Sequence, residues 1–225
     1  MRKIIVLFNL FFFSIHAQNI SVSSGRSFTI EKTGSVTASG NFSNSGNFTM
    51  DSDPNEFSSL IVDGTSSGNI TYNRYVNIAV DNGTNEWDLI GSPVDALSIS
   101  SFVGTNSSEI ATSGSTYALG YYDNSTDSWT NYTTASAGDA GYLTLGKGYQ
   151  MASDAGSTLA FTGTVATSDQ TQSVINNTNS SNSGRRWNLI ANPFPSYIHL
   201  NDNNDDTNNF LTVNSSVIDG SYLAV

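Results

Sequence analysis

The apolar residues in the first third of the chain come in very short islands. Between residues 18 and 68, runs of one to three apolar residues alternate with turns rich in Gly, Ser and Asn. Strands this short bury too little surface for an ordinary sandwich, but they suffice when rungs stack and each inward residue packs on the next rung. The stretch Gly40–Thr49 supports stacking, because it repeats Gly-Asn-Phe followed by Ser or Thr at a six-residue step. The pattern predicts a short β-solenoid-like region over residues 18–68, with irregular hairpins as the alternative.

Residues 69–170 show a different pattern, with longer candidate strands that recur every 8–15 residues between turn signals. This spacing is typical of a β-sandwich, here of a jelly-roll-like kind. Ser, Thr, Asn and Gly dominate the composition, and residues that favour helices are sparse. Aromatic residues make up 11% of the chain, which argues against a disordered polar segment. We therefore expect an all-β fold with a sandwich over residues 69–170.

One heptapeptide occurs twice, 100 residues apart (187 − 87 = 100). Trp87-Asp-Leu-Ile-Gly-Ser-Pro93 returns as Trp187-Asn-Leu-Ile-Ala-Asn-Pro193. A repeat at a fixed period indicates a duplicated unit, so we expect a linker over residues 171–184 and a second sandwich unit over residues 185–225. In each unit the tryptophan is predicted to anchor the core and the proline to end a strand. Because Val225 falls where a strand is expected, the second unit is predicted to be incomplete and the chain a fragment.

The N-terminus has the three parts of a secretory signal peptide, predicted over residues 1–17. Two basic residues open it, residues 4–15 are apolar, and Ala17 is the small residue before the cleavage that makes Gln18 the first mature residue. Twelve residues are too few to cross a bilayer as a helix, which takes roughly 20. The sequence therefore predicts a secreted or cell-surface protein with no membrane span after signal removal.

The chain has no cysteine and a formal net charge of −11. Without cysteine there are no disulfides, no thiolate metal ligands and no lipid-modified N-terminal cysteine. Basic residues are few, and only Arg185 and Arg186 adjoin in the predicted mature chain. Nucleic acids and anionic membranes both need clustered Lys and Arg, so neither is an expected partner.

Few residues suit catalysis. Gly64–Gly68 matches the Gly-x-Ser-x-Gly pattern of hydrolase nucleophiles, but that turn needs a helix after it, and the residues that follow favour a strand. The predicted mature chain holds one histidine, His199, and a serine nucleophile needs an imidazole beside it. We therefore expect no catalytic residue and no enzyme activity.

One acidic loop is a candidate calcium site. Asp202, Asn204 and Asp206 occupy positions 1, 3 and 5 of a calcium-loop pattern. The glycine and the bidentate glutamate that complete this pattern are missing. We expect no cofactor, with calcium at this loop as the one candidate and a solvated loop as the alternative.

One group of aromatic residues is a candidate for sugar binding. Tyr122, Trp129 and Tyr132 flank a polar hairpin loop. An exposed strip of such rings can stack on sugars. The alternative is that the rings pack within the sheet, as strand aromatics usually do.

Several motifs resemble large secreted surface proteins of Bacteroidota, of the kind exported by type IX secretion. These motifs are Trp87–Pro93, Leu145–Gln150, Phe161–Gly163 and Trp187–Pro195. The resemblance implies export across both membranes, followed by attachment to the surface or release. The chain departs from the family in one respect, since full-length members end in a sorting β-sandwich and nothing after Pro195 matches one.

Together these observations favour a non-enzymatic structural or adhesive module of an exported cell-surface protein. Its expected partners are a surface polysaccharide or another surface protein. Two alternatives stay open: a carbohydrate-binding module, and the accessory region of a larger secreted enzyme whose catalytic domain lies outside this chain.

Overall fold

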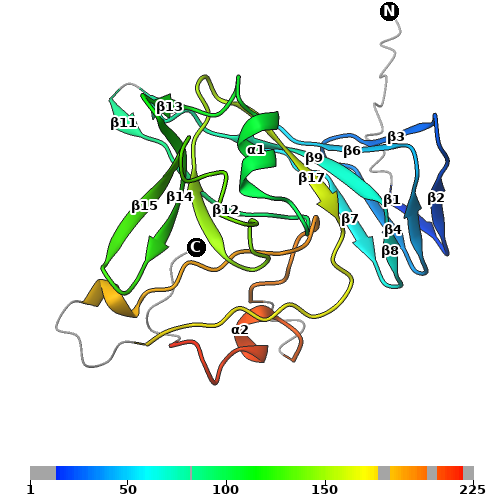
Figure 1. Cartoon of the computed structure of the whole chain (residues 1–225). Helices are drawn as coiled ribbons and strands as arrows, with labels where there is room; N and C mark the ends of the chain where they lie inside the picture. Colours follow the sequence, from blue (N-terminus) through cyan, green and yellow to red (C-terminus); the bar gives the residue numbers. More distant parts are fainter. Residues whose placement is uncertain (1–13, 82, 177–182, 202–206, 220–225) are drawn as a thin grey trace, which may run out of the picture.

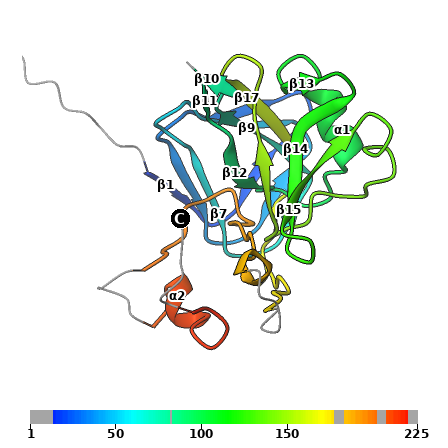
Figure 2. The same cartoon turned by 90° about the vertical axis from the view of Figure 1, so that its left-hand side faces the viewer.

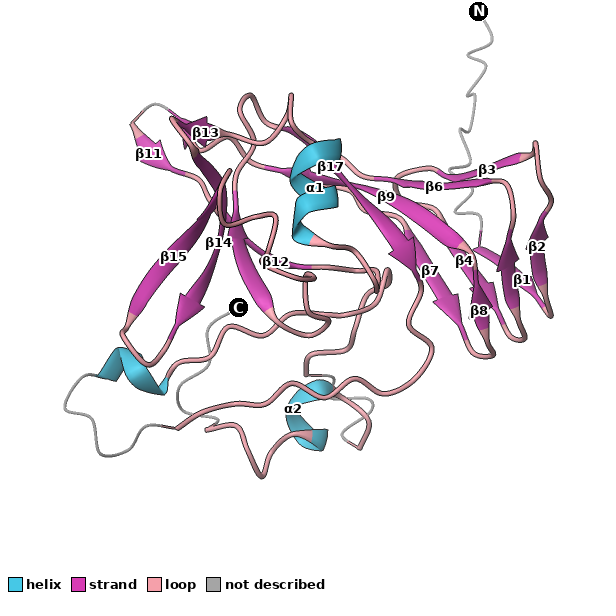
Figure 3. Cartoon of the chain, viewed as in Figure 1, coloured by secondary structure: helices cyan, strands magenta, loops and turns pink. Residues whose placement is uncertain are grey.

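The computed structural model describes residues 14–81, 83–176, 183–201 and 207–219. Strands dominate the molecule, as Figure 3 shows. The helices of the described residues are short: α1 (Ile99–Thr105), α2 (Phe210–Val213) and the 3-10 helix η1 (Ser183–Arg186). The predicted all-β fold class is confirmed.

The first nine strands form three parallel sheets, and each turn of the chain adds one strand to each sheet (Figure 1). The first sheet contains β1 (Ser14–Ala17), β4 (Ser35–Ala38) and β7 (Ser59–Val62). The second contains β2 (Ile20–Val22), β5 (Phe42–Asn44) and β8 (Ser66–Ser67). The third begins with β3 (Ser27–Ile30), β6 (Asn47–Asp51) and β9 (Asn69–Val76). Paired residues lie between 20 positions (Ser27 and Asn47) and 24 positions (Ser35 and Ser59) apart, so the predicted solenoid-like region is confirmed.

Three phenylalanines explain how such short strands fold. Phe42 of β5 and Phe48 of β6 are buried, and their rings meet edge-on with centroids 5.0 Å apart. Phe48 also stacks on Phe28 of β3, one rung earlier, at 5.1 Å. The six-residue Gly-Asn-Phe step thus carries the chain around a corner while both rings stay in one interior. Gly40 and Gly46 stand at these corners because a Cβ would fall 2.2 and 2.3 Å from backbone oxygens of the previous rung.

Strand β9 joins the solenoid to the rest of the chain. It pairs in parallel with β6 and antiparallel with β17 (Ser157–Thr164), which gives the third sheet the order β17-β9-β6-β3. A separate antiparallel sheet has the order β12-β16-β14-β13, with β15 also paired to β14. Its strands are β12 (Asp88–Gly91), β13 (Thr112–Ser113), β14 (Thr116–Asp123), β15 (Ser128–Thr133) and β16 (Gly148–Met151). A small hairpin precedes it, made of β10 (Val80–Asp81) and β11 (Thr84–Asn85).

One apolar core runs through both parts of the molecule. Phe161 of β17 and Leu119 of the antiparallel sheet belong to the same buried cluster as the solenoid phenylalanines. Helix α1 joins this core through Phe102, whose ring centroid lies 4.7 Å from that of Phe161. One layer of the sandwich-like part is therefore the third solenoid sheet itself, which lies behind the antiparallel sheet in Figure 2. The core continues across the boundary expected between residues 68 and 69, so the packing does not mark a domain border there. That boundary stays a prediction.

The two tryptophans of the repeat have different surroundings, so the prediction that both anchor a core is wrong. Trp87 is half-buried against a small cluster of alanines. Trp187 is 42% exposed. The described part of residues 185–225 forms no strand, and its bridge from Ile190 to Lys147 joins it to the first unit. A strand buries a tryptophan only when partner strands cover it, and the second copy has none among the described residues.

The C-terminal strap, which we define as residues 187–197, lies along both parts of the molecule. The carbonyl of Leu189 accepts a hydrogen bond from Gly148 N–H at 3.0 Å. The carbonyl of Pro195 accepts one from Leu60 N–H of β7 at 2.7 Å. The strap therefore bonds to the chain at the start of β16 and, through Pro195, to the edge of β7 that faces away from β4.

The prediction that a proline ends a strand holds for one of the two copies of the repeat. β12 ends at Gly91, two residues before Pro93, whereas Pro193 lies in the strap and ends no strand. Residues 171–176, the described start of the predicted linker, contain no strand. Ser14–Ala17, at the end of the predicted signal peptide, pair in parallel with β4 as β1. Cleavage after Ala17 would remove this strand, and the mature solenoid would begin with β2.

Candidate functional site

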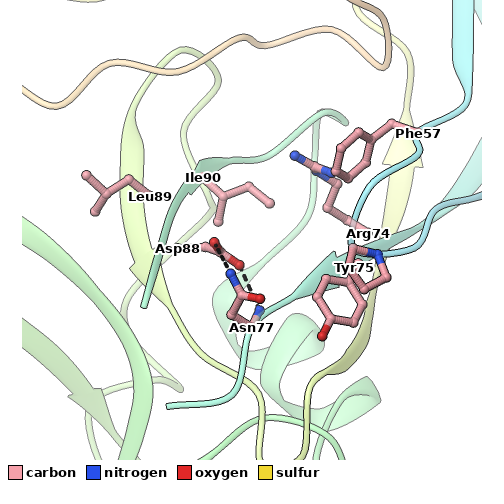
Figure 4. Close-up of a pocket in the computed structure, with 8 residues that line it drawn as sticks. Phe57, Arg74, Tyr75, Asn77, Asp88, Leu89 and Ile90 are labelled. Atoms are coloured by element: carbon pink, nitrogen blue, oxygen red, sulfur yellow. Dashed lines mark hydrogen bonds between the residues drawn. The ribbon is translucent and has the colours of Figure 1, made fainter. Parts of the chain in front are cut away.

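A small pocket lies at the seam between the solenoid and the antiparallel sheet (Figure 4). We call it the seam pocket; it is lined by Pro54, Phe57, Arg74, Tyr75, Asn77, Asp88, Leu89 and Ile90. Its volume is about 90 Å³, which is room for a group of a few heavy atoms. Its walls come from β9 and the residue after it, from β12, and from the loop before β7.

Arg74 occupies an inward position of β9, between the buried Tyr72 and Val76. Its guanidinium carbon lies 3.7 Å from the centroid of the Phe57 ring, an arrangement that stabilises a cation in apolar surroundings. The Nη1 atom is buried and has no hydrogen-bond partner in the described part of the chain. Burial lowers the pKa of Arg74, because desolvation disfavours the charged form.

Asp88 lies across the seam pocket from Arg74, as Figure 4 shows. Its carboxylate accepts hydrogen bonds from the backbone N–H and the side-chain amide of Asn77, at 2.8 and 2.9 Å. These bonds fix the start of β12 against the chain that leaves β9. The seam pocket therefore combines a cation with free donors and a carboxylate whose two oxygens are already bonded.

A second hollow lies on the outward face of the third sheet. Thr29, Thr49, Thr71 and Thr162 are register partners and align from strand to strand. Thr29 and Thr49 have their hydroxyl oxygens 3.1 Å apart, and Thr71 and Thr162 have theirs 2.9 Å apart. The hollow measures about 520 Å³. We call it the threonine groove; it is lined by Ser27, Thr29, Gly46, Asn47, Phe48, Thr49, Asn69, Thr71 and Thr162.

The threonine groove is rich in hydroxyl and amide side chains and has no charged residue in its lining. Alternation along each strand places the threonines outward, so that Thr49 lies between the buried Phe48 and Met50. No lining residue is charged, and the hydroxyls and amides both donate and accept hydrogen bonds. The surface is thus suited to a ligand rich in hydroxyl groups.

The aromatic strip predicted at the β14–β15 hairpin is divided between the two faces of the sheet. Tyr122 and Trp129 are register partners with ring centroids 5.4 Å apart, and Trp129 is 43% exposed. Tyr132 lies on the other face, where it packs on Tyr121 at 5.7 Å and against the core. Residues three apart on a strand face opposite sides, so Tyr132 cannot join the other two in stacking on one sugar.

Tyr122 is held in place by its hydroxyl. This group lies 2.6 Å from the Oδ1 atom of Asp127 and 2.5 Å from the carbonyl oxygen of Gly184, either of which can accept its hydrogen bond. Loss of solvation and the bond to Asp127 raise the pKa of Tyr122 to about 12. The hairpin therefore offers a ligand one exposed ring, that of Trp129, beside a fixed tyrosine.

Comparison with known proteins places the chain in a family. Residues 6–224 match the model of a family described as a domain of unknown function (DUF8693). The chain belongs to this family. No curated protein and no solved structure matches it. The family description names no ligand or reaction, so a function has to be inferred from the side chains.

The described part of this DUF8693 chain has no group of three or more His, Asp or Glu side chains that could hold a metal ion. The calcium candidates Asp202, Asn204 and Asp206 lie outside the described residues. Calcium binding at that loop stays a prediction.

The two residues considered for catalysis, Ser66 and His199, lie in different parts of the fold. Ser66 lies in β8 and is followed by β9, so the strand-turn-helix geometry of a nucleophile does not form at Gly64–Gly68. The carbonyl of His199 accepts a hydrogen bond from Phe210 N–H at the start of α2.

Among the described residues, no helix has the length and apolarity to cross a membrane.

Sequence reasoning missed both hollows of this DUF8693 chain. The threonines recur at steps of 20, 22 and 91 residues, so their alignment is visible only once the strand register is known. The seam pocket had one sign in the sequence. Arg74 is a lone charge in the strand Asn69–Val76, at a position where alternation predicts an apolar side chain.

Proposed function

We propose that the chain is a non-enzymatic adhesive module of an exported cell-surface protein, and that it contacts neutral polysaccharide through the threonine groove. The groove carries this proposal because its lining is rich in hydroxyl and amide side chains, uncharged, and repeated from strand to strand. Adjacent strands lie about 4.8 Å apart. A polymer lying across them would therefore meet an equivalent threonine at each strand.

Hydroxyl and amide side chains suit neutral sugars. Each threonine hydroxyl donates one hydrogen bond and accepts others, as each sugar hydroxyl does. No charge in the lining selects for an ion. Because single contacts at an exposed surface are weak, retention would rely on many of them acting together along one polymer.

The double variant T49V/T71V is expected to bind neutral polysaccharide about tenfold more weakly, or worse. Valine keeps the shape of threonine and removes the hydroxyl, each lost hydrogen bond costs about 0.5–1.5 kcal/mol, and about 1.4 kcal/mol is a factor of ten. Affinity electrophoresis against a panel of polysaccharides, followed by calorimetry on the best ligand, measures the change. The matched control is T37V, because Thr37 also faces outward on a solenoid strand but lies in the first sheet.

Two outcomes would count against this use of the groove. If W129A loses binding while T49V/T71V keeps it, the site is the hairpin, where Trp129 is 43% exposed, and the chain acts as a carbohydrate-binding module of another design. If no polysaccharide binds, the adhesive role is lost. A structural role would then remain, either in a surface protein or as the accessory region of a larger secreted enzyme.

Export is the other half of the proposal, and the mature protein is expected to begin at Gln18. A basic start, an apolar stretch and the small residue Ala17 support this cleavage. N-terminal sequencing of protein recovered from the medium or the cell surface measures it. A start before Ser14 would contradict the prediction and would leave β1 in the mature solenoid. The type IX route rests on the resemblance to Bacteroidota proteins, and a host strain lacking that system should retain the protein inside the cell.

Two further partners belong to the same proposal. Calcium at Asp202, Asn204 and Asp206 is supported by the oxygen ligands at alternate positions of the loop. Thermal melting in calcium and in chelator tests it, since a ligand that binds the folded state raises the melting temperature. A second surface protein as partner is tested by cross-linking on intact cells.

A further inference from the structure

We propose that the seam pocket is a binding site for a carboxylate group, with the guanidinium of Arg74 as its partner. The seam pocket and the threonine groove share no lining residue. Carboxylate binding in the pocket and polysaccharide binding in the groove can therefore succeed or fail separately.

The position of Arg74 calls for a partner. A charged side chain is rarely placed on the inward face of a strand unless something pairs with it. Arg74 stands there, between Tyr72 and Val76. Within the described residues its Nη1 atom donates to nothing and its guanidinium has no ion-pair partner.

Phe57 and the strap orient the guanidinium toward the pocket. The Arg74 side chain lies against the Phe57 ring, as Figure 4 shows. The backbone carbonyl of Phe57 accepts a hydrogen bond from the Tyr197 hydroxyl at 2.9 Å. The backbone that carries the Phe57 ring is thus held in place before any ligand arrives, which reduces the entropy lost on binding.

A carboxylate fits both the chemistry and the size of the seam pocket. Its two coplanar oxygens match the fork of N–H donors of a guanidinium, and its negative charge compensates that of the half-buried Arg74. A volume of about 90 Å³ is far below that of a pocket for a whole drug-sized ligand. The ligand therefore presents the carboxylate as a projecting group, as a small organic acid or a sugar acid does.

Asp88 limits which anions can enter. Its carboxylate lines the same pocket, where it repels any incoming negative charge. A singly charged carboxylate meets less of this repulsion than a doubly charged sulfate. Replacing Asp88 with asparagine should therefore tighten carboxylate binding, because the repulsion disappears while an acceptor for Asn77 remains.

The test is a titration of the mature protein with sodium acetate and sodium glucuronate, followed by NMR shifts. Sodium chloride and sodium sulfate at matched ionic strength are the reference salts. We expect saturable shifts of residues lining the seam pocket with both carboxylates and none with the reference salts. Similar affinity for both carboxylates means that the group alone is recognised, and a preference for glucuronate assigns the site to a sugar acid.

Variants decide whether Arg74 is responsible. R74M keeps the aliphatic stem over Phe57 and should weaken binding about tenfold or more, whereas R74K, with its charge but no fork, should fall between R74M and the wild type. D88N should bind more tightly, and R26M, at an exposed arginine of the solenoid, should bind as the wild type does.

The proposal is overturned if neither carboxylate binds, if sulfate binds equally well, or if a folded R74M binds unchanged. If R74M fails to fold, D88N still tests the proposal. Unchanged or weaker carboxylate binding by D88N would contradict the proposed repulsion.

Discussion

Replacing Phe48 with alanine is expected to lower the free energy of unfolding by about 3–5 kcal/mol, the usual cost of emptying a buried phenylalanine site. Phe48 is 2% exposed, stacks on Phe28 and meets Phe42 edge-on. It therefore links one rung to the next and one sheet to the next. No other single side chain of the solenoid makes ring contacts in both directions within the described residues.

Urea denaturation followed by circular dichroism measures the effect of F48A. The matched control is F28A, which removes the same ring from the same sheet and register one rung earlier, where the side chain is only half-buried. We expect F28A to cost clearly less than F48A. Equal losses, or a loss below about 1 kcal/mol for F48A, would mean that stacking between rungs does not hold the solenoid together.

The same denaturation experiment tests whether the solenoid and the sandwich-like part share one core. Because Phe48 and Phe161 belong to one buried cluster, F48A should shift a single cooperative transition. A chain with an independent solenoid and an independent sandwich would instead show two transitions, of which F48A would move one.

The solenoid was predictable from sequence because its information is local. Each rung repeats short apolar islands, and the Gly-Asn-Phe step at Gly40 and Gly46 marks the corners where backbones approach too closely for any side chain. The second unit was not predictable in the same way. Whether Trp187 is buried depends on strands that would have to pair with its own, and a repeated heptapeptide does not supply them.

The candidate sites lay beyond the sequence because both depend on which strands meet. The threonines align only through the register of four strands, one of which, β17, comes 91 positions after its partner. The seam pocket forms where β9 approaches β12, and the bonds from Asn77 to Asp88 that shape it span 11 positions that include the β10–β11 hairpin. The aromatic hairpin was located correctly. Tyr132 was grouped with Tyr122 and Trp129 because it is near them along the chain, but alternation along the strand places it on the other face of the sheet.

Replacing Gly148 with valine is expected to displace the C-terminal strap. Gly148 of β16 and Gly91 of β12 are cross-strand partners. A Cβ on Gly148 would fall 2.4 Å from the Cγ atom of Leu189, and one on Gly91 would fall 2.4 Å from the Cβ atom of Ala191. The strap therefore lies in a hollow that exists only because both positions lack a side chain, and filling it costs about 1–3 kcal/mol.

Limited trypsin digestion measures this displacement, because Arg186 lies directly before the strap. In G148V the hydrogen bond from Gly148 N–H to Leu189 and the one from Ala191 N–H to Gly146 should be lost, and cleavage at Arg186 should become several-fold faster. The control is G104A in α1, where a Cβ meets no atom within 4 Å and alanine favours the helix. Unchanged cleavage in G148V would show that the strap is held elsewhere, for example where Pro195 bonds to β7. If the strap does leave, the Leu60 N–H at the edge of β7 loses its partner, the carbonyl of Pro195. Since an open strand edge pairs readily with another chain, G148V should also associate in solution where the wild type does not.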